Sequence, residues 1–213
     1  MIVGKSLRIS IVLALCVSGL SACMKPGEDV MMNAQPNVVQ LSTRNANPVT
    51  QLPDAETERR FKAFLTGYSW WDNTPRGSAA IAKPVIHRKA AGTGTYEDPI
   101  TLAVGHRIDY GRQTMDYPAG TRFYFPAIRK YAIVEDVCGD GNRPQISGCH
   151  RGWKGHPWLD IYIGGRWSTA EFSDQCARNI TAIQDVVMHP SPNYPVIAGE
   201  VARSNCKGLP SAS

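Results

Sequence analysis

The stretch Trp158-Leu159-Asp160-Ile161-Tyr162-Ile163-Gly164-Gly165 predicts a β-strand that carries one acid among large side chains. Because side chains alternate along a strand, the apolar residues at 159, 161 and 163 share a face suited to a core. The opposite face presents Asp160 between Trp158 and Tyr162. Partial desolvation raises the pKa of a carboxyl and favours the protonated form that a general acid needs. An Asp in a strand can instead be structural, paired with a basic side chain or capping a turn.

Further short apolar stretches surround this strand and are separated by turn residues. They are 79–82, 85–87, 100–104, 122–128, 131–137, 183–188 and 196–198. Many short strands at such spacing predict an all-β fold, a small β-barrel. The 19 Gly and 15 Pro residues exclude a coiled coil or a simple helical bundle, because both residues are poor helix formers.

We expect one or two short peripheral helices beside the strands. Residues 54–67 predict a short amphipathic helix with an apolar stripe that includes Phe61 and Leu65, capped by Asp54 and ended by Gly67. A second helix is predicted from Ser168 to about residue 178, since its opening residues fit a capping box.

The N-terminus indicates export. Residues 1–22 have two basic residues, no acid and a short apolar run, which is typical of a signal peptide. The run ends in Leu20-Ser21-Ala22-Cys23, which resembles a bacterial lipobox, with Cys23 as the lipidated residue; an ordinary signal peptide is the alternative. By resemblance to Gram-negative sorting, Met24 favours the outer membrane. Residues 23–53 are polar and predict a disordered tether, residues 68–206 the barrel, and 207–213 a tail.

The cysteines fit an oxidising compartment. Cys16 leaves with the signal peptide, and Cys23 carries the lipid. The four others are expected to form two disulfides, for which three pairings exist. Nearness in sequence favours Cys138–Cys149 and Cys176–Cys206. A metal site with His150 and His156 is the alternative, but the thiols lack a tight metal-ligand spacing, so we expect no metal and no other cofactor.

The charge pattern is modest. The net charge is +5, and no run of Lys and Arg exceeds two residues, so no nucleic-acid footprint is present. The five His residues have no Ser or Cys partner at a recognisable spacing, and we assign no nucleophilic triad. We expect a monomer.

Three segments in order carry a resemblance to a known superfamily. They are the turn Pro118-Ala119-Gly120-Thr121-Arg122, the strand 133–137 with Asp136 near its end, and the strand with Asp160. This order resembles the double-psi β-barrel superfamily, which includes rare lipoprotein A, expansins, family-45 endoglucanases and the C-terminal domain of membrane-bound lytic transglycosylase A. Residues 71–101 look closest to secreted expansin-like barrels. The resemblance implies a six-stranded double-psi barrel over about residues 68–202, with Asp160 as the catalytic or essential acid and Asp136 in support.

Two departures from the superfamily bear on chemistry. The segment 137–159 is longer than in expansins, which predicts a partly lidded groove. The segment Tyr68-Ser69-Trp70-Trp71-Asp72 is loosely similar to one that carries a second Asp in family-45 enzymes, and it would place Asp72 opposite Asp160. An inverting hydrolase needs two carboxyls roughly 6.5–9.5 Å apart around a water. A lytic transglycosylase can work with a single residue that serves as both acid and base, because a hydroxyl of the sugar is the nucleophile.

These features predict an exported, lipid-anchored barrel that binds and cleaves peptidoglycan or β-glucan. Aromatic rings stack on sugar rings, and the candidate platform consists of Trp70, Trp71, Trp153, Trp158 and Tyr162. A non-catalytic, expansin-like carbohydrate-binding module is one alternative, and a structural envelope lipoprotein is another. The sequence leaves these open, because catalytic and non-catalytic barrels share the same fold and acid.

Overall fold

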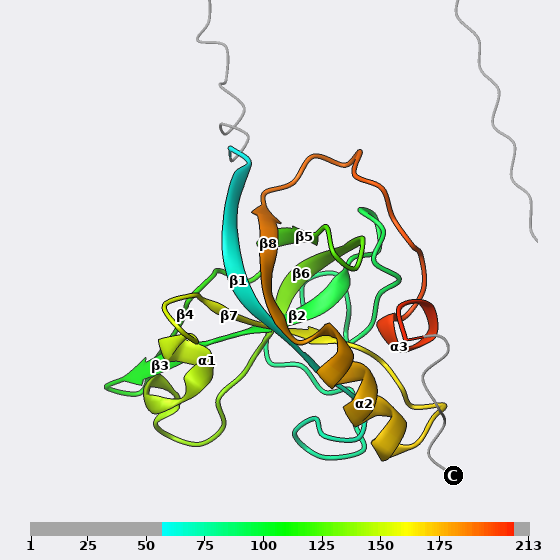
Figure 1. Ribbon diagram of the computed structural model, residues 1–213. Helices are drawn as coiled ribbons and strands as arrows, with labels where there is room; N and C mark the ends of the chain where they lie inside the picture. Colours follow the sequence, from blue (N-terminus) through cyan, green and yellow to red (C-terminus); the bar gives the residue numbers. More distant parts are fainter. Residues whose placement is uncertain (1–56, 207–213) are drawn as a thin grey trace, which may run out of the picture. The chain divides into compact units, whose positions relative to one another are not determined.

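The computed structural model describes residues 57–206 (Figure 1). The predicted signal peptide, Cys23, the tether and the tail lie outside these residues. No helix in the described range is both long and apolar enough to cross a lipid bilayer.

Six strands close into a barrel in the order β1-β7-β2-β6-β5-β8 (Figure 1). Their bounds are β1 Arg59–Tyr68, β2 Ile100–Val104, β5 Arg122–Phe125, β6 Lys130–Val137, β7 Trp158–Tyr162 and β8 Ala182–Met188. A separate two-stranded hairpin is formed by β3 His106–Asp109 and β4 Arg112–Met115. The predicted all-β, six-stranded closed barrel is therefore confirmed.

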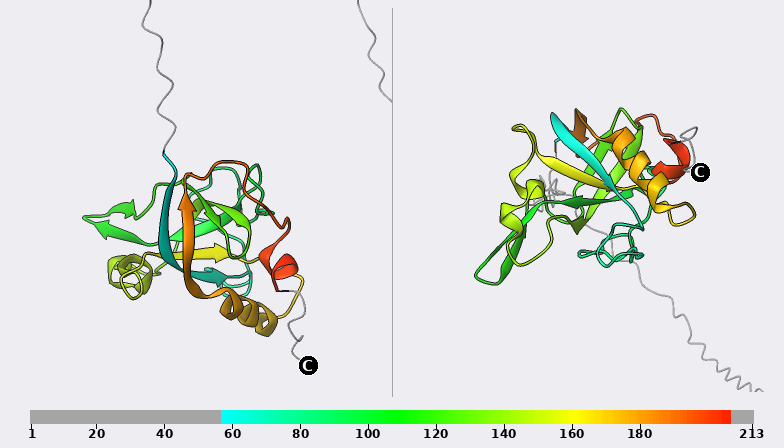
Figure 2. Two further views of the ribbon diagram at one scale, coloured as in Figure 1. Left: turned by 45° about the horizontal axis from the view of Figure 1, so that its top comes forward. Right: turned by 60° about the horizontal axis from the view of Figure 1, so that its bottom comes forward.

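Short helices lie outside the barrel within residues 57–206 (Figure 2). They are η1 Pro144–Ile146, α1 Gly148–Arg151, α2 Ala170–Ile180 and α3 Val201–Ser204. The β3–β4 hairpin projects beside η1 and α1 (Figure 2). The predicted second helix is confirmed as α2, but Thr169 caps it, since the Thr169 hydroxyl accepts a hydrogen bond from the Phe172 amide at 3.2 Å.

Two parallel pairs, β1–β7 and β2–β6, sit in an otherwise antiparallel barrel. The predicted core face of β7 is confirmed, because Leu159, Ile161 and the following Ile163 are fully buried. Other strands supply the same interior with alternate side chains. These include Ala63, Leu65, Leu102, Phe123, Val134 and Val186.

The register around β2 brings two acids together. Ala103 of β2 pairs with Asp160 on one side and with Asp136 on the other. Adjacent strands are about 4.8 Å apart, so the two acid Cα atoms are separated by roughly 10 Å. The β2–β6 register shifts between Leu102 and Ala103, which leaves Glu135 as the extra residue of a β-bulge.

The predicted helix over residues 54–67 is wrong. From Arg59 onward the chain is strand β1, which pairs with β7 and β8; residues 54–56 lie outside the described range. Burial alternates along it, with Ala63 and Leu65 inside, because non-local pairing overrides local helix preference. Gly67 is a packing position, since an added Cβ would lie 2.7 Å from a side-chain atom of Ile163.

The strands predicted at 79–82, 85–87 and 196–198 are also wrong. Residues 79–90 form a loop closed by a 2.8 Å hydrogen bond from the Ala90 amide to the Ala79 carbonyl. The amides of this loop bond to the carboxylates of Glu135 and Asp136 and the carbonyl of Glu135 instead of a neighbouring strand. The loop therefore has short apolar stretches like those of a strand, but its amides bond to acidic residues instead of to a strand.

Both favoured disulfides are present. Cys138–Cys149 and Cys176–Cys206 have Cα–Cα distances of 5.9 and 5.5 Å. The first ties the end of β6 to α1, and the second ties α2 to the end of α3. With all four thiols oxidised, they do not serve as metal ligands, and within residues 57–206 no group of three or more His, Cys, Asp or Glu side chains is arranged to hold a metal ion.

Candidate functional site

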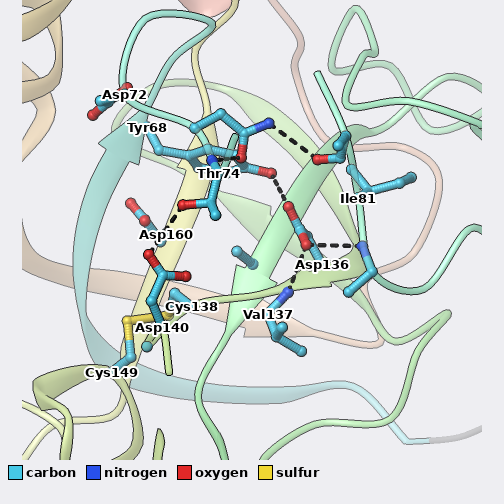
Figure 3. Close-up of a pocket in the computed structure, with 15 residues that line it drawn as sticks. Tyr68, Asp72, Thr74, Ile81, Asp136, Val137, Cys138, Asp140, Cys149 and Asp160 are labelled. Atoms are coloured by element: carbon cyan, nitrogen blue, oxygen red, sulfur yellow. Dashed lines mark hydrogen bonds between the residues drawn. A yellow bond between two sulfur atoms is a disulfide. The ribbon is translucent and has the colours of Figure 1, made fainter. Parts of the chain in front are cut away.

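A cavity of about 470 Å³ opens beside the ends of β1 and β6 and the middle of β7 (Figure 3). It brings together all three predicted acids, Asp72, Asp136 and Asp160. The remaining wall comes from Tyr68, the loop 73–82, Ala103, residues 137–140 and Cys149. The Cys138–Cys149 disulfide thus forms part of the wall, close to Asp140 (Figure 3).

Asp160 is held from strand β1. The parallel register places Thr66 beside it, and the Thr66 hydroxyl donates to Asp160 Oδ1 at 2.6 Å. The Trp158 indole N–H donates to the same Thr66 oxygen at 2.7 Å. Because an indole N–H only donates, the Thr66 hydroxyl accepts from Trp158 and gives its own proton to Asp160. This chain of donors fixes Oδ1 of Asp160.

The surroundings of Asp160 favour its protonated form. Burial raises the pKa of Asp160 to about 7, and the nearby charges of Asp72 and Asp136 act in the same direction. The hydrogen bond from Thr66 opposes this shift. A carboxyl with such a pKa exists in both protonation states near neutral pH, as a general acid requires.

Asp136 is buried and its carboxylate is fully engaged. Oδ1 accepts from the Ala82 amide at 3.0 Å and from the Val137 amide at 2.9 Å, and Oδ2 accepts from the Tyr68 hydroxyl at 3.0 Å (Figure 3). Burial still raises the pKa of Asp136 despite these donors. With both oxygens occupied, Asp136 acts as a scaffold for the cavity wall and for Tyr68.

Tyr68 is hydrogen-bonded to Asp136 and is affected by the charge of Asp160. Burial, followed by the charges of Asp136 and Asp160, raises the pKa of Tyr68 well above its ordinary value. Its hydroxyl therefore stays protonated and donates to Asp136. The Tyr68 ring also packs on Tyr162, with ring centroids 5.3 Å apart.

Two further acids stand at exposed positions of the cavity. Asp72 accepts from the Ser69 amide at 2.7 Å and from the Ser69 hydroxyl at 2.6 Å, so it is part of a local turn. Asp140 accepts from the Thr74 hydroxyl at 3.0 Å (Figure 3). Sequence reasoning missed Asp140 as well as Thr66, although Asp140 lies only four residues after Asp136.

None of the five predicted platform aromatics is among the described residues that line this cavity. Trp158 supports Thr66, and Tyr162 is buried against Tyr68. Trp153 is half exposed and packs on Phe64, with centroids 5.7 Å apart.

The two adjacent tryptophans are engaged with the loop that follows β7. The guanidinium carbon of Arg166 lies 4.6 Å from the ring centroid of Trp70. The indole N–H of Trp71 donates to the Gly165 carbonyl at 3.0 Å. The structure thus gives these rings packing roles around the site, outside its acidic cavity.

Comparison with known proteins places the whole cavity within one family. The family model of the DDB_G0273701 N-terminal domain matches residues 60–207. The chain belongs to this family. An uncharacterized protein of Dictyostelium discoideum, DDB_G0273701/DDB_G0273221, is 34% identical over 112 residues. The match spans 52% of this chain and 42% of that relative, less than half of the relative's length. No solved structure matches the chain.

In this member of the DDB_G0273701 N-terminal domain family, a second buried acid fixes the cavity wall. Glu135 Oε1 accepts from the amides of residues 85, 86 and 87 at 3.2, 2.6 and 2.8 Å. Its Oε2 accepts from the Thr101 hydroxyl at 3.0 Å and lies 2.7 Å from His87 Nδ1. These donors outweigh the effect of burial and lower the pKa of Glu135.

His87 connects this anchor to the next turn. Its Nε2 lies 2.9 Å from Asp98 Oδ1, so each ring nitrogen faces a carboxylate. Burial lowers the pKa of His87, but the hydrogen bonds to Asp98 and Glu135 outweigh it and raise the pKa overall. An imidazolium donates to both carboxylates, whereas a neutral ring donates to one. The loop 79–90 is therefore an anchored wall of the cavity.

Proposed function

We propose that this protein cleaves polysaccharide by general acid catalysis, with Asp160 as the proton donor. The observation that carries the proposal is a carboxyl with a pKa of about 7 at a 470 Å³ cavity. Cleavage of a glycosidic bond needs a proton on the departing oxygen, and a carboxyl whose pKa is near the working pH supplies it well. With Oδ1 bound by Thr66, the proton of the acid form is carried on Oδ2.

The double-psi form of the barrel belongs to the same proposal. A closed six-stranded barrel with parallel pairs β1–β7 and β2–β6 supports it. The order of turn, Asp136 strand and Asp160 strand supports it from the sequence side.

Two routes of cleavage differ in the role of Asp72. As a base, Asp72 would activate water and produce a new reducing end, as in an inverting hydrolase. Without Asp72 as a base, Asp160 first gives its proton to the departing oxygen and then, as a carboxylate, accepts the proton of a sugar hydroxyl that attacks the anomeric carbon; this produces an anhydro end, as in a lytic transglycosylase. Asp136 is unsuited to the role of base, because three donors already occupy its carboxylate.

The test is product release from peptidoglycan and from β-glucan by the purified protein. The wild-type protein should release soluble products, and Asp160→Asn should release none. The matched control Asp174→Asn, which replaces an exposed acid on α2, should release as much product as the wild-type protein. Mass spectrometry in ¹⁸O-water distinguishes the routes: hydrolysis incorporates one ¹⁸O, and anhydro ends incorporate none. Wild-type protein that releases nothing from either glycan would overturn the proposal.

We also propose that the protein is exported and lipid-anchored through Cys23, the residue that ends the lipobox-like tetrapeptide. Labelling of bacterial cells with a palmitate analogue should mark the wild-type chain. Cys23→Ser should remove the label and shift the protein from the membrane to the soluble fraction. Equal labelling of both chains would refute the anchor.

A further inference from the structure

The described lining of the cavity has charge of one sign. Asp72, Asp136, Asp140 and Asp160 all contribute, whereas the residues that line it include no Lys, Arg or His. The chain as a whole has the opposite balance, with 23 basic and 18 acidic residues. The cavity therefore does not reflect the average surface of the protein.

The acids stand at two depths and are held in place. Asp136 and Asp160 come from neighbouring positions across β2, and their oxygens are fixed by Tyr68 and Thr66. Asp72 and Asp140 come from loops and are exposed. A ligand in this cavity is therefore surrounded by carboxyl groups from both the strands and the loops.

The charges of the acids in the cavity act on one another. The charges of Asp72 and Asp136 both raise the pKa of Asp160, so an additional negative charge at the cavity floor is already disfavoured. A substrate carboxylate at the same place experiences the same repulsion, in surroundings where charges interact more strongly than in bulk water.

We propose that the cavity selects glycans whose sugar units carry hydroxyl or amine groups and rejects those with carboxylates. The inference rests on the proposed function, for which it names the substrate class. Carboxylate oxygens accept hydrogen bonds from hydroxyls and from ammonium groups, so a neutral or amine-bearing chain gains contacts at the exposed acids Asp72 and Asp140. Uronate units, lactyl groups and peptide stems with free carboxylates face repulsion without a basic partner.

The test compares two soluble β-glucan hexasaccharides that differ only in one C6 group, hydroxymethyl in one and carboxylate in the other. Binding is followed by surface plasmon resonance on the immobilised full-length protein in the first seconds of contact, because no tryptophan is among the described residues that line the cavity. We expect the carboxylated hexasaccharide to bind about tenfold more weakly at low salt. The difference should shrink as salt is raised, because ionic strength screens exposed charges.

Two variants distinguish the charge of the cavity from that of an exposed acid elsewhere. Asp140→Asn removes an exposed carboxylate of the cavity and should reduce the discrimination about threefold, whereas Asp174→Asn, on α2, should not change it. Equal affinities, or a preference for the carboxylated sugar that Asp140→Asn does not alter, would overturn this inference and leave the proposed function standing. If neither hexasaccharide nor an amine-bearing chitosan hexasaccharide binds, the proposed function itself fails.

Discussion

Replacing Asp160 by Asn should stabilise the protein at high pH and leave its stability unchanged at low pH. The pKa of Asp160 is about 7 in the fold against 3.8 for the ordinary side chain. Between these values the folded state binds more protons than the unfolded state, so stability falls as pH rises. A difference of about 3 pH units corresponds to about 4 kcal/mol at 1.36 kcal/mol per unit. Asp160 keeps partial contact with solvent, so this figure is an upper value.

Urea unfolding under non-reducing conditions measures the effect. At pH 4 both proteins have a neutral side chain at this position and should unfold at similar urea concentrations. At pH 8 the wild-type carboxylate is charged, and Asp160→Asn should raise the midpoint by up to about 2 M, for a slope of about 2 kcal/mol per M. The Asn side chain still accepts the hydrogen bond from Thr66, so packing is preserved.

A control removes an acid elsewhere. Asp174→Asn, at an exposed position of α2, should show no such growth of stabilisation between pH 4 and pH 8. The reasoning is refuted if Asp160→Asn changes stability equally at both pH values, or if it is destabilising at pH 8. Either result would mean that the cavity does not disfavour the charged acid.

Four further substitutions test the supports of the cavity and the barrel. Thr66→Val removes the hydroxyl that donates to Asp160 and should raise the pKa of Asp160 by about 1 unit, measured by ¹³C titration of the carboxyl. Trp158→Phe removes the indole N–H that donates to Thr66 and should raise the same pKa by a smaller amount. An unchanged pKa in both variants would contradict the donor chain. His87→Gln should lower the free energy of unfolding, measured in urea, most strongly below pH 6.5. The loss should become smaller as pH rises through the raised pKa of His87, because the neutral ring donates to only one carboxylate. A loss that is the same at every pH would contradict the imidazolium bridge. Lys130→Met should lower the free energy of unfolding by about 3 kcal/mol. The reason is that the buried Nζ of Lys130 donates hydrogen bonds to the carbonyls of Thr93, Ile197 and Gly199. A loss below about 1 kcal/mol would contradict a stabilising role for these hydrogen bonds.

The sequence predicted those parts of the fold that depend on local pattern. Strand β7 alternates apolar and polar side chains, and α2 opens with a capping signal, so both were found close to their observed bounds. Strand β1 was missed because its conformation is decided by pairing with β7 and β8, far along the chain. That error also hid Thr66, whose place beside Asp160 exists only in the parallel register.

The three predicted acids lie at one cavity, whereas the predicted platform aromatics are not among the described residues that line it, and their role in sugar binding stays a prediction. Asp72, Asp136 and Asp160 meet at one cavity, as the order of segments suggested. The tryptophans were assigned to a platform, because a ring near an acid is all that a sequence shows. Their actual partners are fixed by contacts across the fold, such as the bond from Trp158 to Thr66.

The β-bulge in β6 positions both Asp136 and the residue that anchors the loop 79–90. The register shift leaves Glu135 outside the pairing with β2 and sets Asp136 opposite Ala103, which also pairs with Asp160. Glu135 then binds the amides of residues 85–87, while Asp136 binds that of Ala82 in the same loop. Deleting Glu135, the extra residue of the bulge, would move Asp136 out of register with Asp160 and would at the same time remove the acid that anchors the loop. Bulges re-aim side chains beside functional sites, and this one sets the positions of both Asp136 and Glu135, which hold the loop that forms the cavity wall.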